Sequence, residues 1–265
     1  MRIIGILLIL QIIFVDPQDG YKLIGTLRTD GNLFYSDPIG NIYIIHQNSI
    51  RKYNLRLDKL ADYSNTYLGN ITSVDVSDPL RILLYYKEFN QIVWLDNFLQ
   101  ELRSPIRLDD LLIDQVNLVC SSSQGGFWVY NRLNNQIQYF DATLRLIHES
   151  INLQSLIGKQ NPSCMIEKSS IVYLNVPETG ILLFDRFGTY FQTLPVFSDK
   201  NLQVTDENIF YTRHNAFHKF NISTYTNTII NLPDTIDLKG VMMQQEYLYL
   251  FKKDGIYTYL STRSD

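Results

Sequence analysis

The sequence has little cysteine and no excess of basic residues, and both shortages narrow the possible classes of protein. Its 265 residues include only two cysteines, Cys120 and Cys164, so the chain is not a disulfide-dense scaffold. Acidic residues outnumber basic ones by 27 to 23, which gives a formal net charge of -4. The broad basic field that nucleic acid or an anionic membrane surface requires is therefore missing. We expect neither of these as a partner.

Signatures of catalysis are missing as well. The chain contains no G-x-S-x-G, no H-E-x-x-H and no glycine-rich phosphate loop. His214 and His218 have the spacing of helical zinc ligands, but they flank a predicted hairpin, where that spacing has no such meaning. The sequence therefore favours a protein that is not an enzyme and carries no cofactor or metal.

Long apolar runs are confined to the amino terminus. Arg2 precedes the run Ile3 to Val15, which is shorter than the roughly 20 residues needed to span a bilayer. A short basic start and an apolar segment of this length are typical of a secretory signal peptide, although no small-x-small cleavage motif follows. A buried first strand or a short membrane anchor is the alternative. We predict a signal peptide at residues 1–20 and one domain at residues 21–265, without a transmembrane segment in the mature chain. The protein would then be periplasmic, outer-membrane-associated or extracellular.

Aromatic residues, by contrast, are abundant, and they favour strands over helices. The chain has 18 Tyr and 14 Phe, which fit the pleated, half-buried surface of a sheet. A repeated pattern of apolar strand, polar turn and apolar strand occurs six times. Three long hairpins end in an apolar residue followed by Asp, and three are shorter. They lie at 82–96, 127–141 and 171–185, and at 42–54, 209–221 and 248–260.

The spacing of these hairpins predicts the fold. Their first residues are separated by 38 to 45 residues, the period of four-stranded propeller blades. An inner strand is expected about seven residues before each hairpin and an outer strand after each of the first five, including 100–102, 144–148, 190–194 and 224–230. The sixth hairpin has no outer strand of its own. We therefore predict an all-β, six-bladed β-propeller of antiparallel blades, with Tyr21 to Arg28 supplying the missing strand and closing the ring. Two similar links, from Ile106 and from Ile151, are each expected to form a turn of helix.

Two features mark the predicted axis. Cys120 and Cys164 occupy the same position in neighbouring repeats, where a Cα separation beyond ~7 Å would prevent a disulfide. We expect both to pack near the axis as small apolar residues. Asp75 holds the same position in the second repeat, and a carboxylate there requires a polar partner, for which water in the channel is the simplest choice.

The chain resembles the six-bladed propellers of the NHL-repeat, TolB-like and YWTD-type groups, on the six repeats and on endings such as Tyr139-Phe140-Asp141. It also looks like small exported propellers of Bacteroidota. The resemblance covers about residues 21–265 and is one of architecture, because the YWTD motif itself is not present and no catalytic residue can be transferred.

Two functions remain open. The first is a monomeric, non-enzymatic interaction or scaffold propeller that contacts a protein partner in the periplasm or cell envelope. The alternative is a small-ligand binder, or a hydrolase or lyase, with a metal at the axis. The candidate ligands for such a site are Asp75, His46, Asn117 and Glu167.

Overall fold

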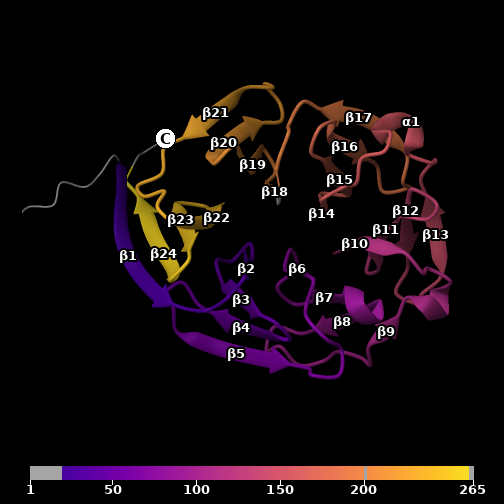
Figure 1. The fold of residues 1–265 in the computed structure, drawn as a ribbon, viewed down its shortest axis with the longest axis horizontal. Helices are drawn as coiled ribbons and strands as arrows, with labels where there is room; N and C mark the ends of the chain where they lie inside the picture. Colours follow the sequence, from indigo (N-terminus) through magenta and orange to yellow (C-terminus); the bar gives the residue numbers. More distant parts are fainter. Residues whose placement is uncertain (1–19, 200–201, 263–265) are drawn as a thin grey trace, which may run out of the picture.

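The computed structural model describes residues 20–199 and 202–262, which form six four-stranded antiparallel sheets. Figure 1 looks down the ring, where the sheets surround a common axis as blades, with the first strand of each near the axis and the fourth at the rim. This is the six-bladed β-propeller that the repeat predicts.

The strands of each blade follow one another in the chain, except in the last blade. From axis to rim, blade one consists of β2 (Leu33–Ser36), β3 (Ile42–His46), β4 (Ser49–Tyr53) and β5 (Lys59–Ser64). Blade two consists of β6 (Ser73–Asp75), β7 (Ile82–Tyr86), β8 (Gln91–Leu95) and β9 (Ile106–Arg107). Blade three consists of β10 (Val116–Ser121), β11 (Phe127–Asn131), β12 (Gln136–Phe140) and β13 (Leu146–Glu149). Blade four consists of β14 (Cys164–Lys168), β15 (Ile171–Val176), β16 (Gly180–Phe184) and β17 (Tyr190–Leu194). Blade five consists of β18 (Leu202–Val204), β19 (Asn208–Arg213), β20 (Ala216–Asn221) and β21 (Asn227–Ile230). Blade six consists of β22 (Leu238–Gln244), β23 (Tyr247–Lys252), β24 (Gly255–Ser261) and β1 (Tyr21–Arg28).

Short helices occur between some strands. They are η2 (Lys87–Phe89), η3 (Asp109–Leu111) and α1 (Gln154–Ile157). Because η3 and α1 lie in the two links that resemble each other, the expected turn of helix in each link is confirmed. Within the described residues, no helix combines the length and the apolar character needed to cross a membrane.

The two middle strands of most blades are buried on both faces. Every residue of β7, β11 and β16 is buried, whereas the rim strands β5 and β13 are largely exposed. Since each blade is packed between two neighbours, its middle strands contact apolar side chains on both sides, and unbroken apolar runs fit them better than alternating ones. The hairpins are visible in the sequence for this reason.

The strand directions divide the turns between two faces of the disc. In each blade the turns between the first and second and between the third and fourth strands lie at one end of the sheet. We call this end the turn face. The turns between the second and third strands, and the links between blades, lie at the other end, which we call the link face.

The ring is closed by the amino-terminal strand, as predicted. β1 pairs antiparallel with β24, from Tyr21 opposite Ser261 to Arg28 opposite Gly255, with a bulge at Ile24. In Figure 1 the indigo strand β1 lies beside the yellow strand β24 at the rim of the last blade. The edge of β24 is therefore paired. The predicted signal peptide, apart from Gly20, lies outside the described residues.

The rim strand of the second blade differs from the prediction. Residues 100–102 were expected to form it, but Glu101 makes only an isolated bridge to Leu95, and β9 at Ile106–Arg107 pairs with Gln91 and Ile92. Pro105 has no backbone N–H to donate to a sheet, so regular pairing resumes only after it. The predicted rim strand 190–194 matches β17, and those at 144–148 and 224–230 overlap β13 and β21.

The Asp that ends each long hairpin shapes the turn that follows. The Oδ1 atom of Asp141 accepts hydrogen bonds from the backbone N–H groups of Thr143 and Arg145, at 2.8 and 3.0 Å, and Leu144 adopts a positive φ of 66°. Asn54, Asp96 and Asp185 cap their turns through the same two positions. The repeated acid is therefore a turn-forming residue in an Asx motif.

Candidate functional site

Asp75, at the end of β6, is bound by the neighbouring blade. Its Oδ2 atom accepts hydrogen bonds from the backbone N–H and the hydroxyl of Ser121 on β10, both at 2.8 Å, and its Oδ1 atom accepts the N–H of Ser77. The carboxylate thus has protein partners, where water in the channel was expected. Asp75 joins the second blade to the third.

Glu167, on β14, does the same at the next boundary and is buried. Its Oε2 atom accepts a 2.7 Å hydrogen bond from the indole Nε1 of Trp128, and its Oε1 atom accepts the N–H and the hydroxyl of Ser123. The buried indole N–H therefore has an acceptor. A buried carboxylate is tolerated here because three donors replace its water.

Polar side chains link the blades at the other boundaries too. The links are the Val74 N–H to the hydroxyl of Tyr35, Lys168 to Asp206, Gln203 to the backbone of Met243, and Gln244 to the carbonyl of Pro38. With Asp75 and Glu167 they form a belt around the inner part of the ring. The two axial acids are members of this structural belt.

His46 and Asn117 lie toward the link face. Nδ1 of His46, at the end of β3, is 3.0 Å from the carbonyl oxygen of Asp30, and the carboxylate of Asp30 accepts a 2.8 Å hydrogen bond from Arg51. Oδ1 of Asn117, at the start of β10, accepts a 3.0 Å hydrogen bond from Nζ of Lys87.

The four predicted ligands do not form one constellation. Asp75 pairs with Leu83 at the start of β7, at the turn-face end of its blade, whereas His46 pairs with Ser49 beside the β3–β4 turn on the link face. Glu167 lies toward the turn face with Asp75, and Asn117 toward the link face with His46. Over residues 20–199 and 202–262, no three His, Cys, Asp or Glu side chains are grouped so that they could hold a metal ion.

The cysteines lie at the axis and are free. Tyr35, Asp75, Cys120 and Cys164 occupy the same repeat position in the first four blades, seven residues before each hairpin. Burial raises the pKa of the Cys164 thiol to about 11 and raises that of Cys120 well above its usual value. Both are therefore protonated, weakly nucleophilic thiols near neutral pH.

A groove runs along the boundary of the second and third blades, and sequence reasoning missed it. Its first hollow, of about 110 Å³, opens at the turn face and is lined by Arg81, Trp94, Leu102, Arg103, Gly125, Gly126, Phe127, Asp141, Ala142 and Leu144. Its second hollow, of about 370 Å³, shares Arg103 and Leu144 and continues along Ser104, Pro105, Ile106, Arg107, Asp110 and Leu111. We call the two hollows together the arginine groove.

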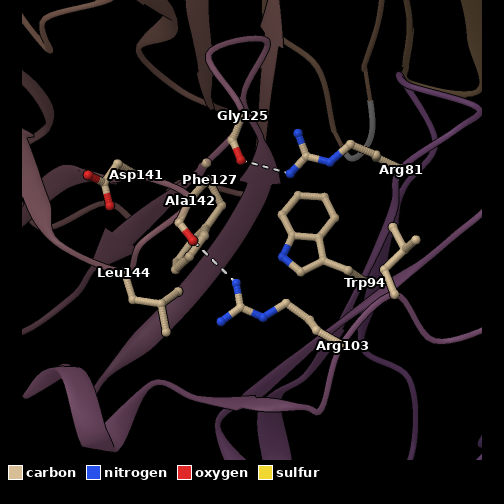
Figure 2. Close-up of a pocket in the computed structure, with 10 residues that line it drawn as sticks. Arg81, Trp94, Arg103, Gly125, Phe127, Asp141, Ala142 and Leu144 are labelled. Carbon is tan, nitrogen blue, oxygen red and sulfur yellow. Dashed lines mark hydrogen bonds between the residues drawn. The ribbon is translucent and has the colours of Figure 1, made fainter.

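Two arginines flank the indole of Trp94 in this groove (Figure 2). The guanidinium of Arg81 lies over the ring at 4.7 Å from its centroid, and Nη2 donates a 2.7 Å hydrogen bond to the carbonyl of Gly125. Nη1 of Arg103 donates a longer bond of 3.3 Å to the carbonyl of Ala142. Trp94 is buried between blades, and its ring also supports the cation of Arg81.

The sequence carries only a weak signal for this groove. Arg81 and Arg103 are 22 positions apart, on either side of the hairpin that contains Trp94, and nothing in that spacing brings them together. The pairing arises because the turn before β7 and the segment after β8 lie at the same end of one blade, facing Gly125 and Ala142 of the next.

Comparison with known proteins supports the fold but no particular function. No protein-family model and no curated protein matches the sequence. Among solved structures, the WD40 domain of Neurospora crassa Pan2 is similar, with a TM-score of 0.61 and 10% identity over 92% of this chain and 96% of that one. A virginiamycin B lyase from Staphylococcus aureus has a TM-score of 0.58 and 12% identity over 91% and 99%. BamB from Moraxella catarrhalis has a TM-score of 0.51 and 12% identity over 91% and 73%. At these identities the likeness is one of fold, and it transfers no activity.

Proposed function

We propose that this chain is a non-enzymatic protein-interaction propeller of the cell envelope. The main support for the proposal is that the two acids near the axis, Asp75 and Glu167, are already bound by the protein. Asp75 and Glu167 each accept three hydrogen bonds, two of them from the neighbouring blade for Asp75 and all three for Glu167, so a ligand at these carboxylates would have to displace bonds that hold the blades together. An enzymatic site needs groups that are free to meet a substrate.

The two faces of the disc suit contact with another protein. Their turns are fixed by side-chain caps and belong to a rigid scaffold, so little conformational entropy is lost when they bind. Large apolar side chains extend from them into solvent. Tyr67 and Leu112 on the link face are 88% and 90% exposed, and Leu80 and Phe98 on the turn face are 66% and 68% exposed.

The proposed location rests on the amino-terminal sequence. The run Ile3 to Val15 behind Arg2 has the length and polarity of a signal peptide, and we propose that it directs export to the periplasm or the outer surface. In the producing cell, the protein is then expected in the periplasmic or outer-membrane fraction at a mass reduced by about 20 residues.

Co-purification tests the function. The protein, tagged at its carboxyl terminus, is expressed at its native level and recovered after mild crosslinking of intact cells. The proposal expects a partner in a fixed ratio to the tagged chain, lost when the exposed turns of one face are replaced. Recovery of the chain alone, from cells in which it is folded and exported, would contradict it.

A further inference from the structure

The arginine groove holds positive charge that the protein does not neutralise. Arg81, Arg103 and Arg107 line it, and within the described residues none of them has a nitrogen within 4.0 Å of a carboxylate oxygen. These three cations line one groove on a chain whose formal net charge is -4.

The guanidinium of Arg81 is fixed in position by two contacts. Its contact with Trp94 and its bond to Gly125 fix the plane of the group, yet that bond uses one of its five N–H donors. An immobilised guanidinium forms further bonds at a small cost in side-chain entropy. Arg103, fixed less tightly by Ala142, is exposed and can adjust to what binds.

The acids of the groove leave most of this charge uncompensated. Asp141 accepts hydrogen bonds from Nε and Nη2 of Arg145, at 3.1 and 2.9 Å, and from Thr143. Its negative charge is therefore balanced by Arg145, which does not line the groove. Figure 2 shows its carboxylate directed away from Arg81 and Arg103. Asp110, which lines the second hollow, is the other acid.

The form of the groove suits a polypeptide. The first hollow, of about 110 Å³, is smaller than the ~300–1,000 Å³ of sites that enclose an organic ligand, and the second, of about 370 Å³, is near the lower end of that range, so each can take a side chain. The second hollow adjoins it and shares Arg103, so successive side chains of an extended chain could use both. Apolar surface in the groove comes from Leu102 and Leu144, while the rings of Trp94 and Phe127, which also line it, are buried.

We propose that the arginine groove binds an extended acidic segment of a partner protein. One carboxylate of the segment pairs with Arg81 and another with Arg103, while an apolar side chain between them contacts Leu102 and Leu144. Arginine is suited to this role because its planar fork meets a carboxylate through two parallel hydrogen bonds. The inference rests on the proposed interaction function and names the partner's chemistry.

Selection from a display library tests it without knowledge of the partner. Random linear dodecapeptides on phage are panned against the immobilised wild-type protein, and the enriched peptides are synthesised and titrated against the soluble protein. We expect peptides with at least two Asp or Glu and an apolar residue between them, whose affinity falls as NaCl is raised from 0.05 to 0.5 M. Replacing their acids by Asn and Gln should abolish binding.

Variants then locate the site. Arg103→Gln should weaken the selected peptides about tenfold, and Arg81→Gln at least as much. Arg186→Gln is the matched control, since Arg186 also stacks on an aromatic ring, Phe187, on the turn face of another blade, and it should leave affinity unchanged. Because Arg103 is exposed, its variant is expected to keep the wild-type melting temperature.

Three results would overturn the inference: no enrichment, enriched peptides without acids, or equal binding to the Arg103→Gln and wild-type proteins. Competition by free glutarate at the same concentration as the peptide would point to a small-anion site and overturn it too. If co-purification still yields a partner after any of these results, the interaction function stands and the groove is not its site.

Discussion

We expect the two axial thiols to react slowly in the folded protein. The pKa of Cys164 is raised to about 11 and that of Cys120 well above its usual value, chiefly because burial removes water from the thiolate. We predict that the native protein reacts negligibly with Ellman's reagent at pH 8, whereas the protein unfolded in guanidinium without reductant releases two equivalents. Rapid labelling of the native protein would contradict the raised pKa, and fewer than two thiols after unfolding would reveal a disulfide.

The buried Glu167 is expected to be a strong stabilising residue. In Glu167→Gln an amide NH₂ replaces one of the oxygens that accept from Trp128 and Ser123, so one buried donor faces another. Hydrogen bonds to charged groups contribute about 1.5–3 kcal/mol each, and we predict a loss of about 2–3 kcal/mol in the free energy of unfolding at pH 7. Urea denaturation measures this.

The exposed Glu178 supplies the control for that substitution. Glu178→Gln should change the free energy of unfolding by less than about 0.5 kcal/mol. Equal effects of the two substitutions would show that the belt does not stabilise the ring.

Among the elements, the capped turn after β12 should contribute a stability that depends on pH. Hydrogen bonds from the backbone of Arg145 and then from Thr143 lower the pKa of Asp141 from its usual 3.8. A carboxyl with a depressed pKa in the folded state stabilises the protein above its unfolded pKa and loses that contribution as the pH falls through the folded value. Asn can still cap the turn, as Asn54 does, but it cannot titrate.

The variant Asp141→Asn isolates this contribution. We predict that the wild type is more stable than the variant at pH 6 and that the difference narrows steadily between about pH 5 and pH 2. Urea denaturation of both proteins across this range is the measurement. A difference that does not depend on pH would show that the charge of Asp141 contributes nothing.

The helical turn η3 contains a strained position that can be relieved. Leu112 follows the helical turn with a φ of 61°, and its side chain is 90% exposed. The cost of the left-handed backbone is therefore offset by almost no burial of the side chain. That conformation costs a non-glycine residue about 1–2 kcal/mol, and glycine adopts it freely at some entropic cost. Leu112→Gly should raise the free energy of unfolding by about 0.5–1 kcal/mol.

Leu133→Gly provides the comparison. Leu133 is also an exposed turn residue but does not have a positive φ, so glycine there should lower stability slightly. Thermal unfolding of both variants distinguishes the two effects. A loss of stability in Leu112→Gly would contradict the account of strain.

At the scale of the whole molecule, the sequence was sufficient for the fold. Blade number, hairpin positions and closure by Tyr21 to Arg28 follow from repeated apolar strands, because the same packing recurs at each blade. The rim strand of the second blade was misplaced, since Pro105 acts on pairing in a way that the repeat does not encode.

The site could not be predicted in the same way. Asp75 was recognised as an unusual acid and Glu167 only as a candidate ligand, but their partners Ser121 and Trp128 belong to neighbouring blades, and a repeat does not reveal which side chains meet across a boundary. The arginine groove was hidden for the same reason. It brings together Arg81 and Arg103 from separate turns and the carbonyl groups of a different blade.

The most direct test of the central claim is photo-crosslinking in the producing cell. A benzophenone amino acid is placed at Leu102 in the arginine groove, at Leu133 on the link face, or at Ile229 on the rim, all of which are exposed in the isolated chain. We predict a discrete adduct with a second protein from Leu102 and none from Ile229. An adduct from Leu133 alone would keep the interaction function and reject the groove, whereas no adduct at any of the three positions would contradict the account.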